Sequence, residues 1–124
     1  MKASVIRRYC HAAVIKLICV VKRKPGMSPE EFHRYWREVH GPLIASTRSG
    51  SHVVRYEQNP RPLSSYASDP GGYDGVTIQW FESEASFRAS LAEDDYRLID
   101  EDLPKFLDVP SLVFLLTEGE HVVF

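Results

Sequence analysis

The chain has 124 residues, of which 44% are hydrophobic and 26% are charged, and its formal net charge is −2. This size and composition predict one globular domain with a core of its own and exclude a disordered or fibrous class. The basic residues form no block longer than residues 22–24, which indicates that the protein does not bind nucleic acid.

The first 21 residues combine early arginines with a later apolar run, as secretory signals do. Lys16 interrupts that run, and no small-residue cleavage site follows it. The run is also too short and too charged to span a membrane. Cys10 and Cys19 have neither CxxC nor metal-ligand spacing, which favours a reducing compartment. We therefore expect an N-terminal extension over residues 1–12, a domain over residues 13–124 and a cytoplasmic protein without a membrane partner.

The segment from residue 28 to residue 47, SPEEFHRYWREVHGPLIAST, predicts a well-capped helix. Ser28 suits the N-cap position, and Glu31 follows three residues later, which makes a capping box. Apolar side chains then recur at helical spacing and predict one buried face. These residues are Phe32, Trp36, Val39 and Leu43.

His40 lies at the margin of that face, one turn after Trp36. Pro42 has no N–H to donate, and Gly41 before it is a poor helix former, so we expect the helix to kink or end here. A break would open space beside the imidazole. His40 is therefore a candidate acid–base group, and the alternative is a helix C-terminal histidine that only interacts with the dipole.

The other segments predict strands and helices in a simple order. Strands are expected over residues 13–21, 52–58, 76–82 and 111–117, and helical segments over residues 28–47 and 83–106. In the second strand, alternation places His52, Val54 and Tyr56 on one face. The order β-α-β-β-α-β predicts an α+β ferredoxin-like fold, with a four-stranded antiparallel sheet and both helices on one face.

Residues 59–72 show neither the helical nor the strand periodicity of hydrophobic residues, which predicts a long loop between two strands. Loops of this length in small domains are usually functional or mobile. Tyr66 lies within the loop and Tyr73 beside it, so we expect a lid over an apolar pocket. The alternative is a variable surface loop that carries two tyrosines.

The predicted strands are apolar on both sides, so the sheet face without helices also needs a cover. The third strand presents Val76, Ile78 and Trp80 in one direction and Thr77, Gln79 and Phe81 in the other. We expect a two-fold homodimer whose two sheets meet face to face.

Three segments carry a resemblance to a known family: IKLICVVKRKPGMSPEEFHRYWREVHGPL, YDGVTIQWFES and the closing TEGEHVV. With these, the chain resembles the EthD-domain family of the dimeric α+β barrel superfamily over roughly residues 14–123. The resemblance implies a dimeric barrel and a pocket in each protomer between the sheet and its helices. Proteins of this superfamily include decarboxylases or dehydratases of aromatic polyketide pathways, polyketide cyclases, an isomerase and cofactor-free monooxygenases.

The resemblance also implies candidate site residues, because such reactions move protons in an apolar cavity. His40 matches the histidine of the family motif and would be the general acid/base. Further catalytic candidates are Tyr56 and Tyr73 as polarising hydroxyls, Asp74 as a residue that orients a histidine and His121 as a second acid–base group. Each tyrosine could equally be a core residue, and Asp74 before a glycine could be simple turn chemistry. The candidates for binding substrate are Trp36, Leu43, Tyr66 and Trp80.

No cofactor or metal is expected. The five histidines are scattered, and no glycine-rich phosphate loop or GxSxG nucleophile occurs. The sequence thus predicts a cofactor-independent lyase, that is a decarboxylase, dehydratase or cyclase, whose substrate is an aromatic or polyketide-derived small molecule of secondary metabolism. Two alternatives remain: a cofactor-free monooxygenase of aromatic polyketides, and a non-catalytic accessory dimer that binds small molecules.

Overall fold

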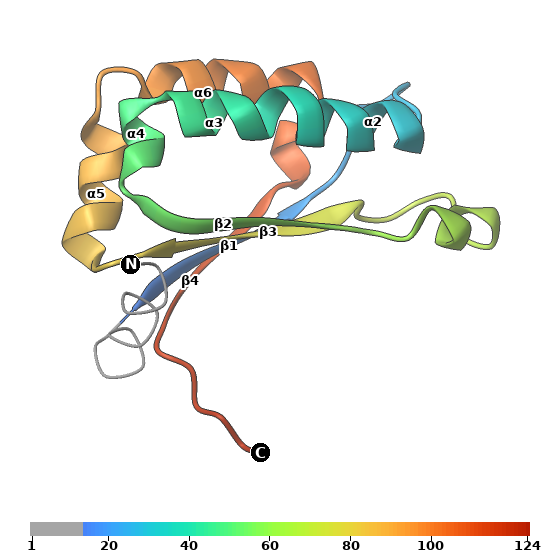
Figure 1. Ribbon diagram of the computed structural model, residues 1–124. Helices are drawn as coiled ribbons and strands as arrows, with labels where there is room; N and C mark the ends of the chain where they lie inside the picture. Colours follow the sequence, from blue (N-terminus) through green and yellow to red (C-terminus); the bar gives the residue numbers. More distant parts are fainter. Residues whose placement is uncertain (1–13) are drawn as a thin grey trace.

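The computed structural model describes residues 14–124, in which a four-stranded antiparallel sheet has the strand order β2-β3-β1-β4. The helices gather on one side of this sheet (Figure 1). The α+β ferredoxin-like prediction is therefore confirmed, while the extension expected over residues 1–12 lies outside the described residues. The elements are β1 (Ile15–Val21), α2 (Pro29–Tyr35), α3 (Gly41–Ser46), α4 (Arg48–Ser51), β2 (Val53–Pro60), β3 (Gly75–Phe81), α5 (Glu84–Ala92), α6 (Tyr96–Asp102) and β4 (Val113–Glu118).

The N-cap predicted at Ser28 is present, and a second serine caps α5. The Ser28 hydroxyl accepts a hydrogen bond from the Glu31 N–H at 3.1 Å, which is one of the two bonds of a capping box. The same hydroxyl donates to the Glu31 carboxylate at 3.0 Å. The Ser83 hydroxyl accepts the Ser86 N–H at 3.1 Å and starts α5. Within residues 14–124, no helix has the length and apolar composition needed to cross a bilayer.

Of the two predicted outcomes at Gly41-Pro42, a kink or an end, the end is wrong, because a π-helical turn over Trp36–His40 joins α2 to α3. The Gly41 N–H bonds to the Trp36 carbonyl five residues back. The wider turn tolerates the missing N–H of Pro42, so the chain stays helical as far as Ser46.

The π-helical turn also rotates the buried face of the helix. A wider turn places residues four apart directly above one another, and the buried series becomes Phe32, Trp36, His40 and Ile44. Val39, which the α-helical spacing placed on the buried face, is 44% exposed, and Leu43 is only half-buried. His40 thus lies at the centre of the buried face, where the sequence placed it at the margin.

The predicted alternation, with His52, Val54 and Tyr56 on one face, is wrong, because β2 contains a β-bulge. Val53 pairs with Phe81 and Arg55 pairs with Trp80, so Val54 is an extra residue. As a result Val53 and Tyr56 lie on the same side of the sheet and line one cavity. Without the bulge, Tyr56 would share its face with Val54 and His52.

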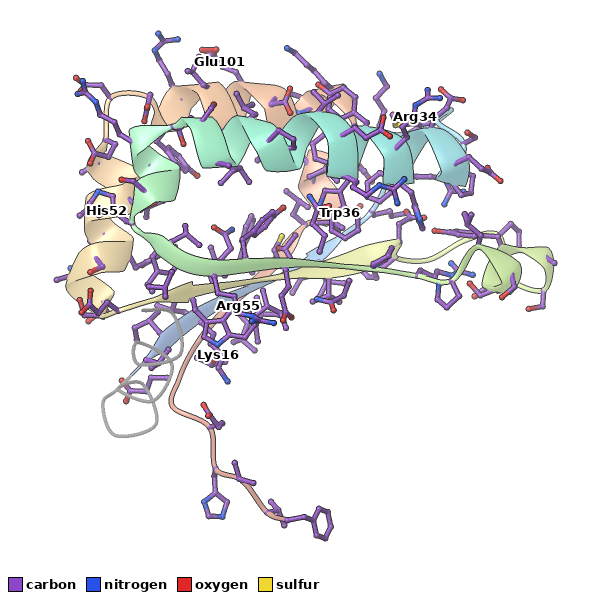
Figure 2. All side chains as sticks on the ribbon, viewed as in Figure 1. Lys16, Arg34, Trp36, His52, Arg55 and Glu101 are labelled. Atoms are coloured by element: carbon purple, nitrogen blue, oxygen red, sulfur yellow. The ribbon has the colours of Figure 1, made fainter. Side chains whose placement is uncertain are left out.

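The two faces of the sheet differ in what covers them. Thr77, Gln79 and Phe81 point toward the helices, so Val76, Ile78 and Trp80 point to the other side. Figure 2 shows Trp36 on the helix side and Lys16 and Arg55 on the opposite side. Ile18 continues the apolar strip of the helix-free face, where it pairs with Ile78 and Leu115.

The core on the helix side is built around aromatic rings. Phe32 and Phe106 stack with centroids 5.8 Å apart, and Trp36 lies 5.3 Å from Phe32. The Trp36 ring lies directly on the backbone of β3 at Gly75, where an added Cβ would come within 2.7 Å of the indole. Only glycine allows this close approach.

We predict that Gly75→Ala lowers the free energy of unfolding by about 1–3 kcal/mol, because the methyl group would push Trp36 and the Asn59 carbonyl away. Urea denaturation followed by circular dichroism measures this loss. Gly26→Ala is not a suitable control because Gly26 has a positive φ. Ser68→Ala, at an exposed loop position, serves instead. Equal stability of Gly75→Ala and the wild type would contradict the packing described.

Candidate active site

A cavity of about 100 Å³ lies between the sheet and the helices that cover it. Its wall is mainly apolar, with Leu17, Trp36, Ile44, Phe81 and Phe106 among the lining residues. The polar groups in the wall are few and uncharged or weakly basic, and they include His40, Tyr56, Gln79 and Tyr96. No Asp, Glu, Lys or Arg of residues 14–124 lines it.

His40 is held in this wall by a carboxylate on another helix. Its Nδ1 lies 2.9 Å from Oδ2 of Asp102, which ends α6, and the two side chains are each 6% exposed. The carboxylate accepts hydrogen bonds, so the imidazole proton is assigned to Nδ1. His40 Nε2 has no hydrogen-bond partner among residues 14–124, which leaves its lone pair for a ligand.

Tyr35 completes this arrangement from the far side of the carboxylate. Its hydroxyl donates to Asp102 Oδ1 at 2.6 Å. Burial, together with the neighbouring carboxylate, raises the pKa of Tyr35 to about 12, so the phenol remains a donor. Burial lowers the pKa of His40, and the hydrogen bond and charge of Asp102 oppose that shift. The imidazole is therefore neutral at pH 7 and has the form of a general base.

Tyr56 supplies a hydroxyl to the same cavity. Its oxygen accepts a hydrogen bond from Gln58 Nε2 at 3.1 Å and another from the Trp36 side chain. Burial raises its pKa to about 12. Within the described part of the chain the Tyr56 hydroxyl proton has no acceptor. It is free to donate to a ligand oxygen, as a polarising group must.

Gln58 links Tyr56 to the π-helical turn. Its amide nitrogen also donates to the Trp36 carbonyl at 2.7 Å. This contact passes close to Gly41, where an added Cβ would lie 3.1 Å from the Gln58 nitrogen. The glycine before Pro42 thus makes room for the residue that positions Tyr56.

Asp74, expected as a partner that orients a histidine, lies in a different cluster. Its fully buried carboxylate accepts the Arg23 guanidinium at 2.6 Å, the Arg23 backbone N–H at 2.7 Å and the Tyr66 hydroxyl at 2.6 Å. Arg61 stacks over the Tyr66 ring at 4.1 Å and donates to backbone carbonyls of the loop. These four residues, Arg23, Arg61, Tyr66 and Asp74, form a loop cluster that fixes residues 61–74.

The remaining predicted site residues also lie outside the cavity. Tyr66 belongs to the loop cluster, and Tyr73 is 43% exposed beside it. Trp80 is on the helix-free face, with the Arg55 guanidinium 5.4 Å from its ring. His121 is in the exposed C-terminal tail, and Ile44 occupies the place expected for Leu43 because of the π-helical turn. The structure therefore brings His40, Tyr56 and Trp36 together and leaves the other candidates apart.

A metal site is not formed by the described residues: no three His, Cys, Asp or Glu side chains of residues 14–124 are grouped to hold an ion. Cys19 lines the cavity, and burial raises the pKa of its thiol to about 11. A thiol of this kind is protonated at pH 7 and is a poor nucleophile.

The chain matches a known family model over most of its length. Residues 24–110 match the family model described as the EthD domain. The chain belongs to the EthD domain family. A comparison with curated proteins gives no significant match.

Solved structures share the fold of this EthD domain at low sequence identity. An EthD-like protein from Ralstonia eutropha JMP134 is 21% identical over 90% of this chain and 94% of that chain, with a TM-score of 0.61. SnoaB, a cofactor-independent oxygenase from Streptomyces nogalater, is 13% identical over 90% and 98% of the two chains, with a TM-score of 0.61. A dimeric ferredoxin-like protein of unknown function from Thermobifida fusca YX is 16% identical over 86% and 91%, also with a TM-score of 0.61.

The site of the EthD domain includes residues that sequence analysis did not find. Asp102 is separated from His40 by 62 positions and lies in a helix with several other acidic residues, so no local pattern marks it. Tyr35 and Gln58 have no distinguishing spacing either. For Gln79, one signal was present: it is a polar residue in the middle of an otherwise apolar strand.

We predict that His40 titrates below pH 6.5 in the folded EthD domain, and that Asp102→Asn lowers its pKa further because the carboxylate favours the imidazolium. NMR titration of the His40 Cε1–H resonance measures both values. Tyr35→Phe keeps the carboxylate and removes a competing donor, so it should not lower the pKa of His40. A pKa that rises in Asp102→Asn would contradict the assigned pair.

Proposed function

We propose that this EthD domain is a cofactor-independent lyase that uses His40 as general acid/base on an aromatic or polyketide-derived small molecule. The observation that carries the proposal is the His40–Asp102 pair: Nδ1 is fixed at 2.9 Å from a buried carboxylate, and Nε2 is left free at a largely apolar cavity. A base that is neutral near pH 7 and shielded from water suits proton abstraction next to a carbonyl.

In the proposed reaction, His40 Nε2 takes a proton from a carbon adjacent to a substrate carbonyl. The electron pair moves to the carbonyl oxygen, and the Tyr56 hydroxyl donates a hydrogen bond to the enolate that forms. Asp102 stabilises the imidazolium. In a dehydration the imidazolium then returns the proton to a departing hydroxyl group, which leaves as water, so His40 ends as it began.

A cofactor-free monooxygenase is the second candidate, and one comparison favours it. SnoaB shares this fold and is a cofactor-independent oxygenase. The same proton abstraction would give a substrate carbanion that reacts with molecular oxygen. The third candidate, a small-molecule-binding accessory dimer, needs the cavity and not the base.

We predict that His40→Gln lowers kcat/KM at least about a hundredfold while the protein stays folded, because glutamine keeps the polar contact and cannot exchange protons. The assay uses a panel of enolisable aromatic and β-keto compounds, with product followed by mass spectrometry. His52→Gln is the matched control, since His52 lies outside the cavity and pairs with Glu93 at 2.6 Å.

Three outcomes separate the candidates. Turnover that continues without oxygen supports the lyase, and turnover that stops supports the oxygenase. Binding without turnover for every compound supports the accessory protein. Loss of activity with a chelator, or full activity in His40→Gln, would refute the proposed mechanism.

We also propose that the EthD domain forms a homodimer through the helix-free face of its sheet. The apolar strip of that face includes Ile18, Ile78 and Leu115, and Leu115 is 57% exposed. An exposed apolar sheet of this kind is an aggregation hazard for a monomer. The Thermobifida fusca protein of the same fold is dimeric.

The C-terminal tail supports the same assembly. Val122, Val123 and Phe124 are among the most exposed side chains, and the tail runs away from the helix side of the sheet (Figure 1). It therefore does not close over the cavity of its own protomer. We propose that it contacts the partner.

We predict that sedimentation at micromolar concentration gives twice the protomer mass, with an interface that buries on the order of 1,500 Å² or more. Leu115→Lys should shift the protein to the monomer, because it places a charge in the apolar strip. Val39→Lys, at a position on the helix side that is 44% exposed, should leave the dimer intact. A wild-type monomer would refute this assembly.

A further inference from the structure

Gln79 is a polar side chain of the cavity wall that neither the acid–base pair nor the Tyr56 contacts use. It lies on β3, opposite Tyr56 on β2 and opposite Leu17 on β1. Directly paired residues of neighbouring strands have Cβ atoms about 5 Å apart. The Gln79 side chain therefore leaves the sheet beside that of Tyr56, on the cavity side.

The Gln79 amide has no hydrogen-bond partner among residues 14–124. The contrast with Gln58 is direct, because the amide of Gln58 donates to two protein oxygens, one of them that of Tyr56. A half-buried amide without a protein partner is costly to keep in an apolar wall unless a ligand or water satisfies it. Beside the free Tyr56 proton, it offers one further donor and one further acceptor.

The charge of the cavity wall restricts the charge of a ligand that Tyr56 and Gln79 can bind. The part of the chain that the structure describes contributes no Lys or Arg to the cavity, and burial lowers the pKa of His40. A carboxylate that entered would lose its water without gaining a cation. The wall therefore favours a ligand that is neutral at pH 7.

The volume sets the size of the buried part of the ligand. A cavity of roughly 150 Å³ holds one benzene ring, and the space here is about 100 Å³. Phe114 lines the cavity and is 58% exposed, so the wall reaches the surface there. The enclosed space is smaller than the cavity that holds benzene, so at most one ring enters it, and the rest of the ligand would extend past Phe114.

We propose that Gln79 is a substrate-positioning residue that, together with Tyr56, holds two oxygens of a neutral single-ring phenol or enolisable ring ketone. Tyr56 donates to one oxygen, and the amide of Gln79 pairs with a hydroxyl or carbonyl on the other. This inference rests on the proposed function, and it favours dehydration or cyclisation over decarboxylation, since a decarboxylase must take a carboxylate.

The test is a binding measurement that needs no turnover. Resorcinol, 3,5-dihydroxybenzoate and toluene are titrated into the full chain at pH 7.5, with tryptophan fluorescence or calorimetry as the readout. We expect resorcinol to bind more tightly than its carboxylate analogue. Gln79→Met, which keeps the length of the side chain, should weaken resorcinol about tenfold and leave toluene unchanged.

Gln79→Glu provides a second variant that keeps an acceptor and adds a charge, and it should weaken resorcinol as well. Unchanged resorcinol affinity in both variants, tighter binding of dihydroxybenzoate, or no binding of either neutral ring by the wild type would overturn the proposal. Failure of the proposed function gives a different result: His40→Gln would then retain full activity while the binding pattern of the Gln79 variants holds.

Discussion

The site depends on the π-helical turn at Trp36–His40. A regular α-helix would bury Val39 and Leu43 and leave His40 at the edge, whereas the wider turn buries His40 and Ile44. The same turn lets the Trp36 carbonyl accept both the Gly41 N–H and the Gln58 amide. One local change in backbone geometry thus places the base, orders the group that supports Tyr56 and accommodates Pro42. π-Turns are frequent at functional sites because they re-aim side chains in this way.

The two sides of the His40 imidazole have different surroundings. The carboxylate of Asp102 stands behind the imidazole, where Tyr35 and His40 bind it from two sides and Lys105 Nζ lies 3.8 Å from its Oδ1. In front of the imidazole the wall is apolar, with only neutral donors and acceptors. A low-dielectric environment strengthens each hydrogen bond to charge that develops during a reaction. It also explains why the pKa of His40 falls although a carboxylate adjoins it: burial outweighs the attraction.

Two buried aspartates of this chain have different roles, which their partners decide. Asp74 binds an arginine and a tyrosine and anchors the loop of residues 61–74. Asp102 binds a histidine and a tyrosine and orients the base. Removing one partner of a buried ion pair such as Arg23–Asp74 is costly, so the loop cluster gives the long loop an order that its composition does not suggest. The loop is fastened beside the sheet and carries none of the described residues that line the cavity.

The sequence by itself determined the fold class and the central histidine. The fold class follows from local signals, each of which acts over a few residues. These signals are the caps at Ser28 and Ser83 and the helical and strand periodicities of hydrophobic residues, which together give the order of the segments. The motif around His40 was readable for the same reason. The tertiary structure decided which residues meet: Asp102 reaches His40 across 62 positions, and a bulge and a π-helical turn each shift one face by one residue. Such shifts depend on packing between elements, as where the Trp36 ring lies on the backbone at Gly75. The periodicity of one segment therefore could not reveal them.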